Sequence, residues 1–147
     1  MKTILVSACL LGERCRYDGK SKPCNAVLAL RDKYRLVPIC PEVMGGLPTP
    51  RVPSEISGDR VMMKNGRDVT QNYQNGAQKA LALARENGCT VAVLKERSPS
   101  CGKGLVYDGS FSGTLVSGNG ICAALLLKNG IRVLSESEIE ENADALL

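Results

Sequence analysis

Short runs of apolar and β-branched residues alternate along the chain with longer segments whose apolar positions recur at helical spacing. The short runs are typical of buried strands and cover residues 3–7, 36–39, 90–94 and 131–134. Helices are expected over residues 23–33, 70–87 and 119–128, and from Ser135 onward, where Ser135 and Glu138 form a capping-box pattern. Strands that alternate with helices in this way predict a parallel sheet with right-handed crossovers.

The expected fold is a three-layer, mainly parallel α/β sheet flanked by helices, which is a Rossmann-like architecture. A chain of 147 residues is the size of one domain, so residues 1–147 are expected to form a single unit. The first three strands are each followed by a long segment that reads as loop, over residues 8–22, 40–57 and 95–114. Long loops in compact domains are usually functional. A small hairpin is also expected, with residues 60–63 as one arm and a turn at Asn65–Gly66.

Composition excludes several classes of site. The chain has no histidine, which rules out a Ser-His-Asp triad, a Cys-His dyad and a zinc site with histidine ligands. Its aromatic residues are four tyrosines and one phenylalanine, with no cluster that could stack single-stranded bases. The net charge of +4 is mild and indicates attraction of small anions rather than binding to nucleic acid.

The seven cysteines point to an intracellular, reducing environment. No signal peptide precedes the first strand, and no apolar stretch is long enough to span a membrane. We therefore expect a cytoplasmic protein that does not contact membranes. Its thiols are expected to be reduced, buried or bound to metal rather than paired in disulfides.

Three of the cysteines, Cys9, Cys40 and Cys101, come directly after expected strands, inside turns rich in Gly and Pro. Ligands of parallel sheets bind at the carboxyl ends of the strands, so these thiols can converge there. Soft thiolates select zinc or iron–sulfur groups, and three of them would leave one coordination position open. Cys15 lies in the same loop as Cys9 and competes with it for a ligand position. The alternative for any free cysteine is a small buried hydrophobe, which we favour for Cys89 and Cys122.

Two polar groups stand beside these cysteines. Glu42 follows Cys40 by two residues and is either a proton shuttle or a solvated loop carboxylate. Ser98 and Ser100 lie in the turn before Cys101, where a serine hydroxyl either contacts a substrate or stabilises the turn. No glycine-rich phosphate-binding motif is present.

Three segments together resemble the thiouracil desulfidase family, formerly a bacterial domain of unknown function. They are S-A-C-L-L-G-E-R-C-R-Y-D-G, C-P-E-V-M-G-G-L-P-T-P-R and K-E-R-S-P-S-C-G, in this order along the chain. The resemblance implies a [4Fe–4S] cluster held by three cysteines, which match Cys9, Cys40 and Cys101, with Cys15 as the alternative. It also implies that the open iron captures sulfur from a thiolated base such as 2-thiouracil, without redox change. Glu42 and Ser98 match the residues that act on the substrate.

Two other kinds of protein remain compatible with the residues themselves. One is a zinc-binding structural or regulatory module that uses the same thiols. The other is an α/β domain that binds a small molecule without any cluster. The expected partner is a small thiolated base rather than nucleic acid, and nothing in the sequence identifies an acceptor for the released sulfide.

Overall fold

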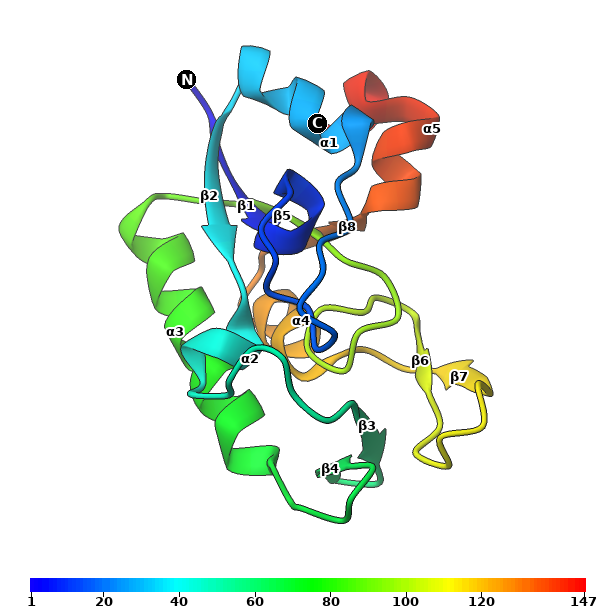
Figure 1. Cartoon of the computed structure of the whole chain (residues 1–147). Coiled ribbons are helices and arrows are strands. Elements are labelled where there is room, and N and C mark those ends of the chain that lie inside the picture. The colour runs from blue at the N-terminus through cyan, green and yellow to red at the C-terminus, as the bar shows by residue number, and fades with distance from the viewer.

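The computed structural model describes the whole chain except the side chains of residues 145 and 146. Four parallel strands form the central sheet in the order β2-β1-β5-β8 (Figure 1). Their bounds are Thr3–Ser7 for β1, Arg35–Ile39 for β2, Val91–Leu94 for β5 and Arg132–Ser135 for β8. The inner strands β1 and β5 are buried on both faces, which explains their nearly continuous apolar sequences.

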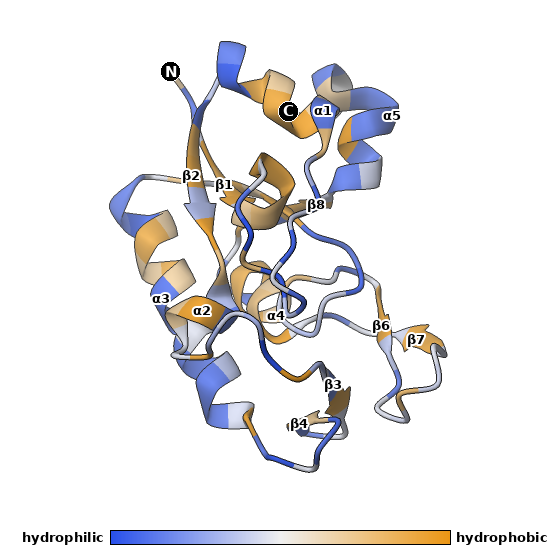
Figure 2. Ribbon diagram, in the orientation of Figure 1, coloured by the Kyte–Doolittle hydropathy of each residue, from blue (hydrophilic) through white to orange (hydrophobic). Residues whose placement is uncertain are grey.

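Helices cover both faces of the sheet and form the two outer layers of the three-layer fold. One face packs against α3, Thr70–Glu86, and α4, Ile121–Lys128. The other face packs against α1, Asn25–Leu28, and α5, Glu136–Leu146, together with the 3₁₀ helices Ala8–Leu11 and Ala29–Asp32. The strands and α4 are largely hydrophobic, whereas α3 and α5 are amphipathic (Figure 2). The expected three-layer parallel architecture is confirmed, and so is the capping box of Ser135 and Glu138.

The sequence suggested a continuous loop over residues 40–57, but the structure has a helix and a strand in this segment. It contains a single helical turn, α2, over Pro41–Met44, which begins with proline at a position that needs no backbone N–H donor. It also contains β3, Ser54–Ser57, which pairs antiparallel with β4, Arg60–Met63. The expected turn at Asn65–Gly66 does form, with Met63 N–H donating to Arg67 O at 2.8 Å, but the main partner of β4 is β3.

The segment 95–114 also contains structure that the sequence did not predict. Its strand β6, Leu105–Tyr107, pairs antiparallel with β7, Leu115–Ser117, and the two form a hairpin that projects beside the β3–β4 hairpin (Figure 1). The strands are only three residues long, and the many glycines around them mask the alternation of apolar and polar positions. Among the described residues, no helix combines the length and apolar character needed to cross a membrane.

Helices α2 and α3 cross with their backbones in contact. A Cβ atom on Gly76 of α3 would lie 1.8 Å from the carbonyl oxygen of Pro41, and one on Gly45 would lie 2.0 Å from that of Asn72. Any side chain at these two positions would push the helices apart. The contact therefore fixes the short helix α2, which includes Glu42, against the long helix α3.

Leu126→Ala is expected to lower the free energy of unfolding by about 2–5 kcal/mol, because it opens a cavity between α4 and the sheet. The side chain of Leu126 is fully buried there. Leu127, the next residue on the same helix, is 39% exposed, and its alanine variant is the matched control, with an expected change within about 0.5 kcal/mol. Urea unfolding monitored by circular dichroism measures both, and equal effects would contradict the assignment of this core.

Candidate active site

A cavity of about 1180 Å³ opens at the carboxyl edge of the sheet. It lies where the chain order reverses, because β1 is flanked by β2 on one side and by β5 on the other. Open α/β sheets bind ligands at such a reversal. The segments that follow β1, β2 and β5 all contribute to its walls. The topology therefore brings the three long segments after the first three sheet strands to one place.

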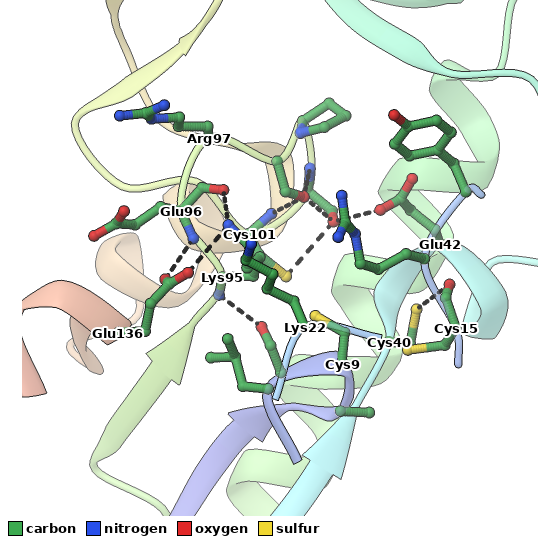
Figure 3. Close-up of a pocket in the computed structure, with 18 of the residues that line it drawn as sticks. Cys9, Cys15, Lys22, Cys40, Glu42, Lys95, Glu96, Arg97, Cys101 and Glu136 are labelled. Atoms are coloured by element: carbon green, nitrogen blue, oxygen red, sulfur yellow. Dashed lines mark hydrogen bonds and ion pairs between the residues drawn. The ribbon is translucent and has the colours of Figure 1, made fainter. Parts of the chain in front are cut away.

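Five cysteines line this cavity: Cys24 is one, and the other four are Cys9, Cys15, Cys40 and Cys101. Their sulfur atoms gather in the centre of Figure 3, with that of Cys15 beside that of Cys40. The Cys40 thiol also donates to the backbone carbonyl of Cys15 at 3.7 Å. The convergence expected for the three strand-end cysteines is therefore present, and Cys15 lies among them.

The other cysteines have different surroundings. Cys89 and Cys122 are buried in the apolar core between the sheet and helices α3 and α4, as the sequence suggested. Cys24 is half-buried just before α1 and also contributes to the cavity wall.

The thiols of Cys40, Cys15 and Cys101 have raised pKa values, which favour their neutral forms. The hydrogen bond with Cys15 and then burial raise the pKa of Cys40 far above that of a free thiol. For Cys15 the hydrogen bond with Cys40 lowers the pKa, but the hydrogen bond with Cys9 and burial outweigh it and bring the value to about 11. Burial raises the pKa of Cys101 to about 12. Deprotonation of these three thiols therefore needs compensating positive charge, which a bound metal group supplies when it displaces the protons.

The donor set suits a soft, multi-metal group. Thiolates are the ligands of iron–sulfur clusters, and the cavity is lined by five thiols from three different segments. In the part of the chain that the structure describes, no three His, Cys, Asp or Glu side chains stand close enough together to enclose a single metal ion. An iron–sulfur cluster is several atoms across, so its ligands surround it at wider spacing than the ligands of one ion.

Glu42 lies in α2 and extends to the cavity next to the thiols (Figure 3). Its Oε1 atom accepts a hydrogen bond of 2.5 Å from the Tyr73 hydroxyl and lies 3.5 Å from Nη2 of Arg51. Its Oε2 atom accepts a hydrogen bond of 3.1 Å from the Ser100 hydroxyl. The carboxylate is thus neither a solvated loop group nor an isolated buried charge, because both oxygens have partners.

The turn before Cys101 is organised by Ser98. The Ser98 hydroxyl oxygen accepts from the backbone N–H groups of Ser100, at 3.1 Å, and Cys101, at 3.0 Å. The two serine hydroxyls are 2.9 Å apart, and the Ser100 hydroxyl is also 3.5 Å from the sulfur of Cys101. A continuous hydrogen-bonded path therefore joins Ser98 to Glu42 through Ser100.

Charged residues line the side of the cavity opposite Glu42. Lys95 pairs with Glu136 at 3.0 Å, and the carboxylate of Glu136 also accepts from the backbone N–H of Glu96 (Figure 3). Lys22 extends toward Cys9 and Cys101 in the same view. Arg97 also lines the cavity, whereas Lys103 is paired with Glu138 at 2.9 Å.

Three residues of the site were missed as site residues by sequence reasoning: Tyr73, Arg51 and Ser100. Tyr73 is on the apolar face of α3 and looks like any core residue in the sequence. Arg51 lies beyond a proline-rich stretch without periodicity. For Ser100 the sequence left open whether its hydroxyl contacts a substrate or stabilises the turn, and the structure gives the stabilisation of the turn to the neighbouring Ser98. The available signal for Ser100 was its position next to a strand-end cysteine.

Known proteins resemble this chain in sequence and in overall fold. Residues 4–138 match the model of the 2-thiouracil desulfurase family. The chain is 43% identical over 148 residues to the uncharacterized protein YbbK of Bacillus subtilis (strain 168), which covers 94% of this chain and 98% of that protein. It is also similar to a solved structure described as the [4Fe-4S]-dependent thiouracil desulfidase TudS, with 48% identity and a TM-score of 0.92. That match covers 99% of this chain and 98% of the other.

Proposed function

The chain belongs to the 2-thiouracil desulfurase family, and from this premise we propose how its cavity carries out the reaction. The protein is a desulfidase that removes sulfur from a thiolated base such as 2-thiouracil and depends on a [4Fe–4S] cluster. One observation carries the proposal for its site: four thiols, a carboxylate and two serine hydroxyls converge on a single cavity at the reversal point of the sheet.

Cys9, Cys40 and Cys101 are the proposed cluster ligands. They come from three separate segments that meet at the cavity, so they can surround a group from three sides. Cys15 interacts with both Cys9 and Cys40, which makes it the alternative ligand from the first segment. When bound by three thiolates, the cluster supplies an iron without a protein ligand, which acts as a Lewis acid toward a soft sulfur atom.

The net reaction replaces the C=S bond of the base by C=O and releases hydrogen sulfide, with water as the only co-reactant and no change in oxidation state. The residues of this chain have to activate that water and deliver a proton to the leaving sulfur. Glu42 is the proposed proton acceptor and donor, because general acid–base catalysis needs a group within hydrogen-bond reach of the reacting atoms. Its Oε2 atom, paired with Ser100, is the oxygen on the side of Cys101.

Ser98 and Ser100 are proposed to have different roles in the reaction. Ser98 is the residue that we propose orients the base. Its hydroxyl also holds the backbone of the turn that presents Cys101. The Ser100 hydroxyl bridges Ser98 and Glu42 and can pass a proton along this path.

Alanine variants of the two serines are expected to differ in cluster content. Ser98→Ala leaves the N–H groups of Ser100 and Cys101 without their acceptor, at a cost of about 1–3 kcal/mol for a buried unsatisfied donor. We therefore expect reduced iron content and reduced kcat. Ser100→Ala leaves the turn intact, so iron content is expected to stay at the wild-type level while kcat falls. Iron analysis beside steady-state kinetics measures both, and equal iron loss in both variants would contradict this division.

The proposed function is tested by reconstitution without oxygen, followed by incubation with 2-thiouracil. Formation of uracil and sulfide in equal amounts, measured by chromatography and a sulfide assay, is the expected result. A thiolated transfer RNA serves as the second substrate and is expected to be left unchanged. A zinc-loaded, inactive protein without iron would favour the structural module. Binding of 2-thiouracil that persists in the triple variant of Cys9, Cys40 and Cys101, without turnover by the reconstituted protein, would favour a simple binding domain.

A further inference from the structure

We propose that Tyr73 and Arg51 are positioning residues, which clamp one oxygen of the Glu42 carboxylate and leave the other for the reaction. This inference rests on the proposed function, since it assigns the geometry of the same site. It adds helix α3 and the segment before β3 to the parts of the fold that determine activity.

The two oxygens of Glu42 have different surroundings. Oε1 faces Tyr73, whose hydroxyl donates to it at 2.5 Å, and Nη2 of Arg51 at 3.5 Å. Oε2 faces Ser100 at 3.1 Å, on the side of Cys101. These contacts fix the orientation of the Glu42 carboxylate. A rotation that exchanged its two oxygens would break three contacts.

The surroundings of Tyr73 keep its hydroxyl protonated, so that it acts only as a hydrogen-bond donor to Glu42. Its side chain is 1% exposed and packs in an apolar cluster with Leu47, Val61, Met63 and Val69. Burial, followed by the charge of Glu42, raises the pKa of its hydroxyl far above the usual value, so the proton stays on tyrosine. A tyrosine kept protonated beside a carboxylate orients it and does not compete with it for proton transfer.

The helix backbone that carries Tyr73 is held rigidly. It lies one turn before Gly76, whose missing side chain allows α3 to touch the backbone of α2 at Pro41. Asn72, on the same helix, donates from Nδ2 to Gly45 O at 2.9 Å and ties the other end of α2. Donor and acceptor thus sit on two helices that are locked together, which is the arrangement that holds reacting groups to within fractions of an ångström.

Arg51 connects the same carboxylate to the thiols. Its side chain is 3% exposed, and it donates to the backbone carbonyl of Cys15 at 3.0 Å as well as to Pro48 O and Thr49 Oγ1, each at 3.2 Å. Its Nε atom is buried and lacks a hydrogen-bond partner among the described residues. The role of Arg51 therefore depends on its charge and on its two Nη groups, which join Glu42 to the segment that contains Cys9 and Cys15.

The two residues therefore have separable effects. Tyr73 donates from its hydroxyl to the catalytic carboxylate, whereas Arg51 contacts both the carboxylate and the backbone of Cys15. Removal of the Tyr73 hydroxyl is expected to impair chemistry alone. Removal of the Arg51 guanidinium is expected to impair chemistry and cluster retention together.

The test compares Tyr73→Phe with Tyr34→Phe as the matched control, both reconstituted without oxygen and assayed on 2-thiouracil. Tyr34 packs against the opposite face of the sheet. For Tyr73→Phe we expect kcat to fall by about 10- to 100-fold, the range for a displaced catalytic group. KM, iron content, the visible absorption of the cluster and the melting temperature are expected to stay at the wild-type values. Tyr34→Phe is expected to match the wild type throughout.

A kcat within twofold of wild type for Tyr73→Phe would overturn the inference, and so would a rise in KM at unchanged kcat. Arg51→Gln supplies the second comparison, with losses expected in both kcat and iron content, and Arg51→Lys is expected to recover part of each. Retention of full iron content and kcat by Arg51→Gln would also overturn it. An inactive wild-type protein that carries its full iron content would instead contradict the proposed function.

Discussion

Replacement of Cys101 by serine is expected to abolish cluster binding and desulfidase activity together. The thiol is 4% exposed in the cavity wall, so no outside ligand can take its place. Loss of groups that merely support metal ligands already costs about 10- to 100-fold in metal affinity or activity, so loss of a ligand should cost more than about 100-fold. Iron and sulfide content, visible absorption and uracil formation measure the outcome.

The other cysteines provide the comparison. Cys9→Ser and Cys40→Ser are expected to behave like Cys101→Ser. Cys15→Ser is expected to keep the cluster, since Cys15 is the fourth thiol beside a three-ligand site. Cys89→Ala, in the core away from the cavity, is the matched control and is expected to retain both iron and activity. Full activity in Cys101→Ser, or iron loss confined to Cys15→Ser, would contradict the ligand assignment.

Replacement of Glu42 by glutamine is expected to remove most of the activity while the cluster stays. Glutamine has the shape of glutamate but cannot exchange a proton, and a positioned acid–base group contributes about 10²- to 10⁴-fold. The same change leaves Arg51 as a buried cation without its counter-charge. Loss of one partner of a buried pair costs about 3–5 kcal/mol, so a fall in the free energy of unfolding is expected as well.

Two measurements separate these effects of Glu42→Gln. Steady-state kinetics on 2-thiouracil should show a lower kcat with KM nearly unchanged, and urea unfolding should show the loss of stability. Glu42→Asp keeps the charge on a shorter side chain and is expected to recover stability more than kcat. A glutamine variant with more than about a tenth of the wild-type kcat would remove Glu42 from the proposed chemistry.

The parts of the fold that the sequence predicted are those with local signals. The four sheet strands and the three longer helices have apolar positions at regular spacing, and the thiols at the strand ends follow from topology. The single-turn helix α2 was missed because four residues are too few to show helical periodicity. The β6–β7 hairpin was missed because its strands are three residues long and lie among glycines.

The candidate site was predictable only where chemistry and sequence position coincide. Glu42 could be named because it stands two residues from Cys40. Tyr73 is separated from Glu42 by 31 residues, and only the contact between α2 and α3 brings them together. Arg51 reaches Glu42 and Cys15 through a chain path that no periodic pattern marks. Long-range packing of single side chains is therefore what the sequence did not reveal.

The most direct measurement is the rate of uracil formation from 2-thiouracil as a function of cluster content, in samples of the same protein reconstituted to different extents without oxygen. The rate is predicted to rise in proportion to the [4Fe–4S] content and to be zero in the sample without iron. Turnover by the iron-free or the zinc-loaded protein at the rate of the cluster-loaded protein would contradict the account.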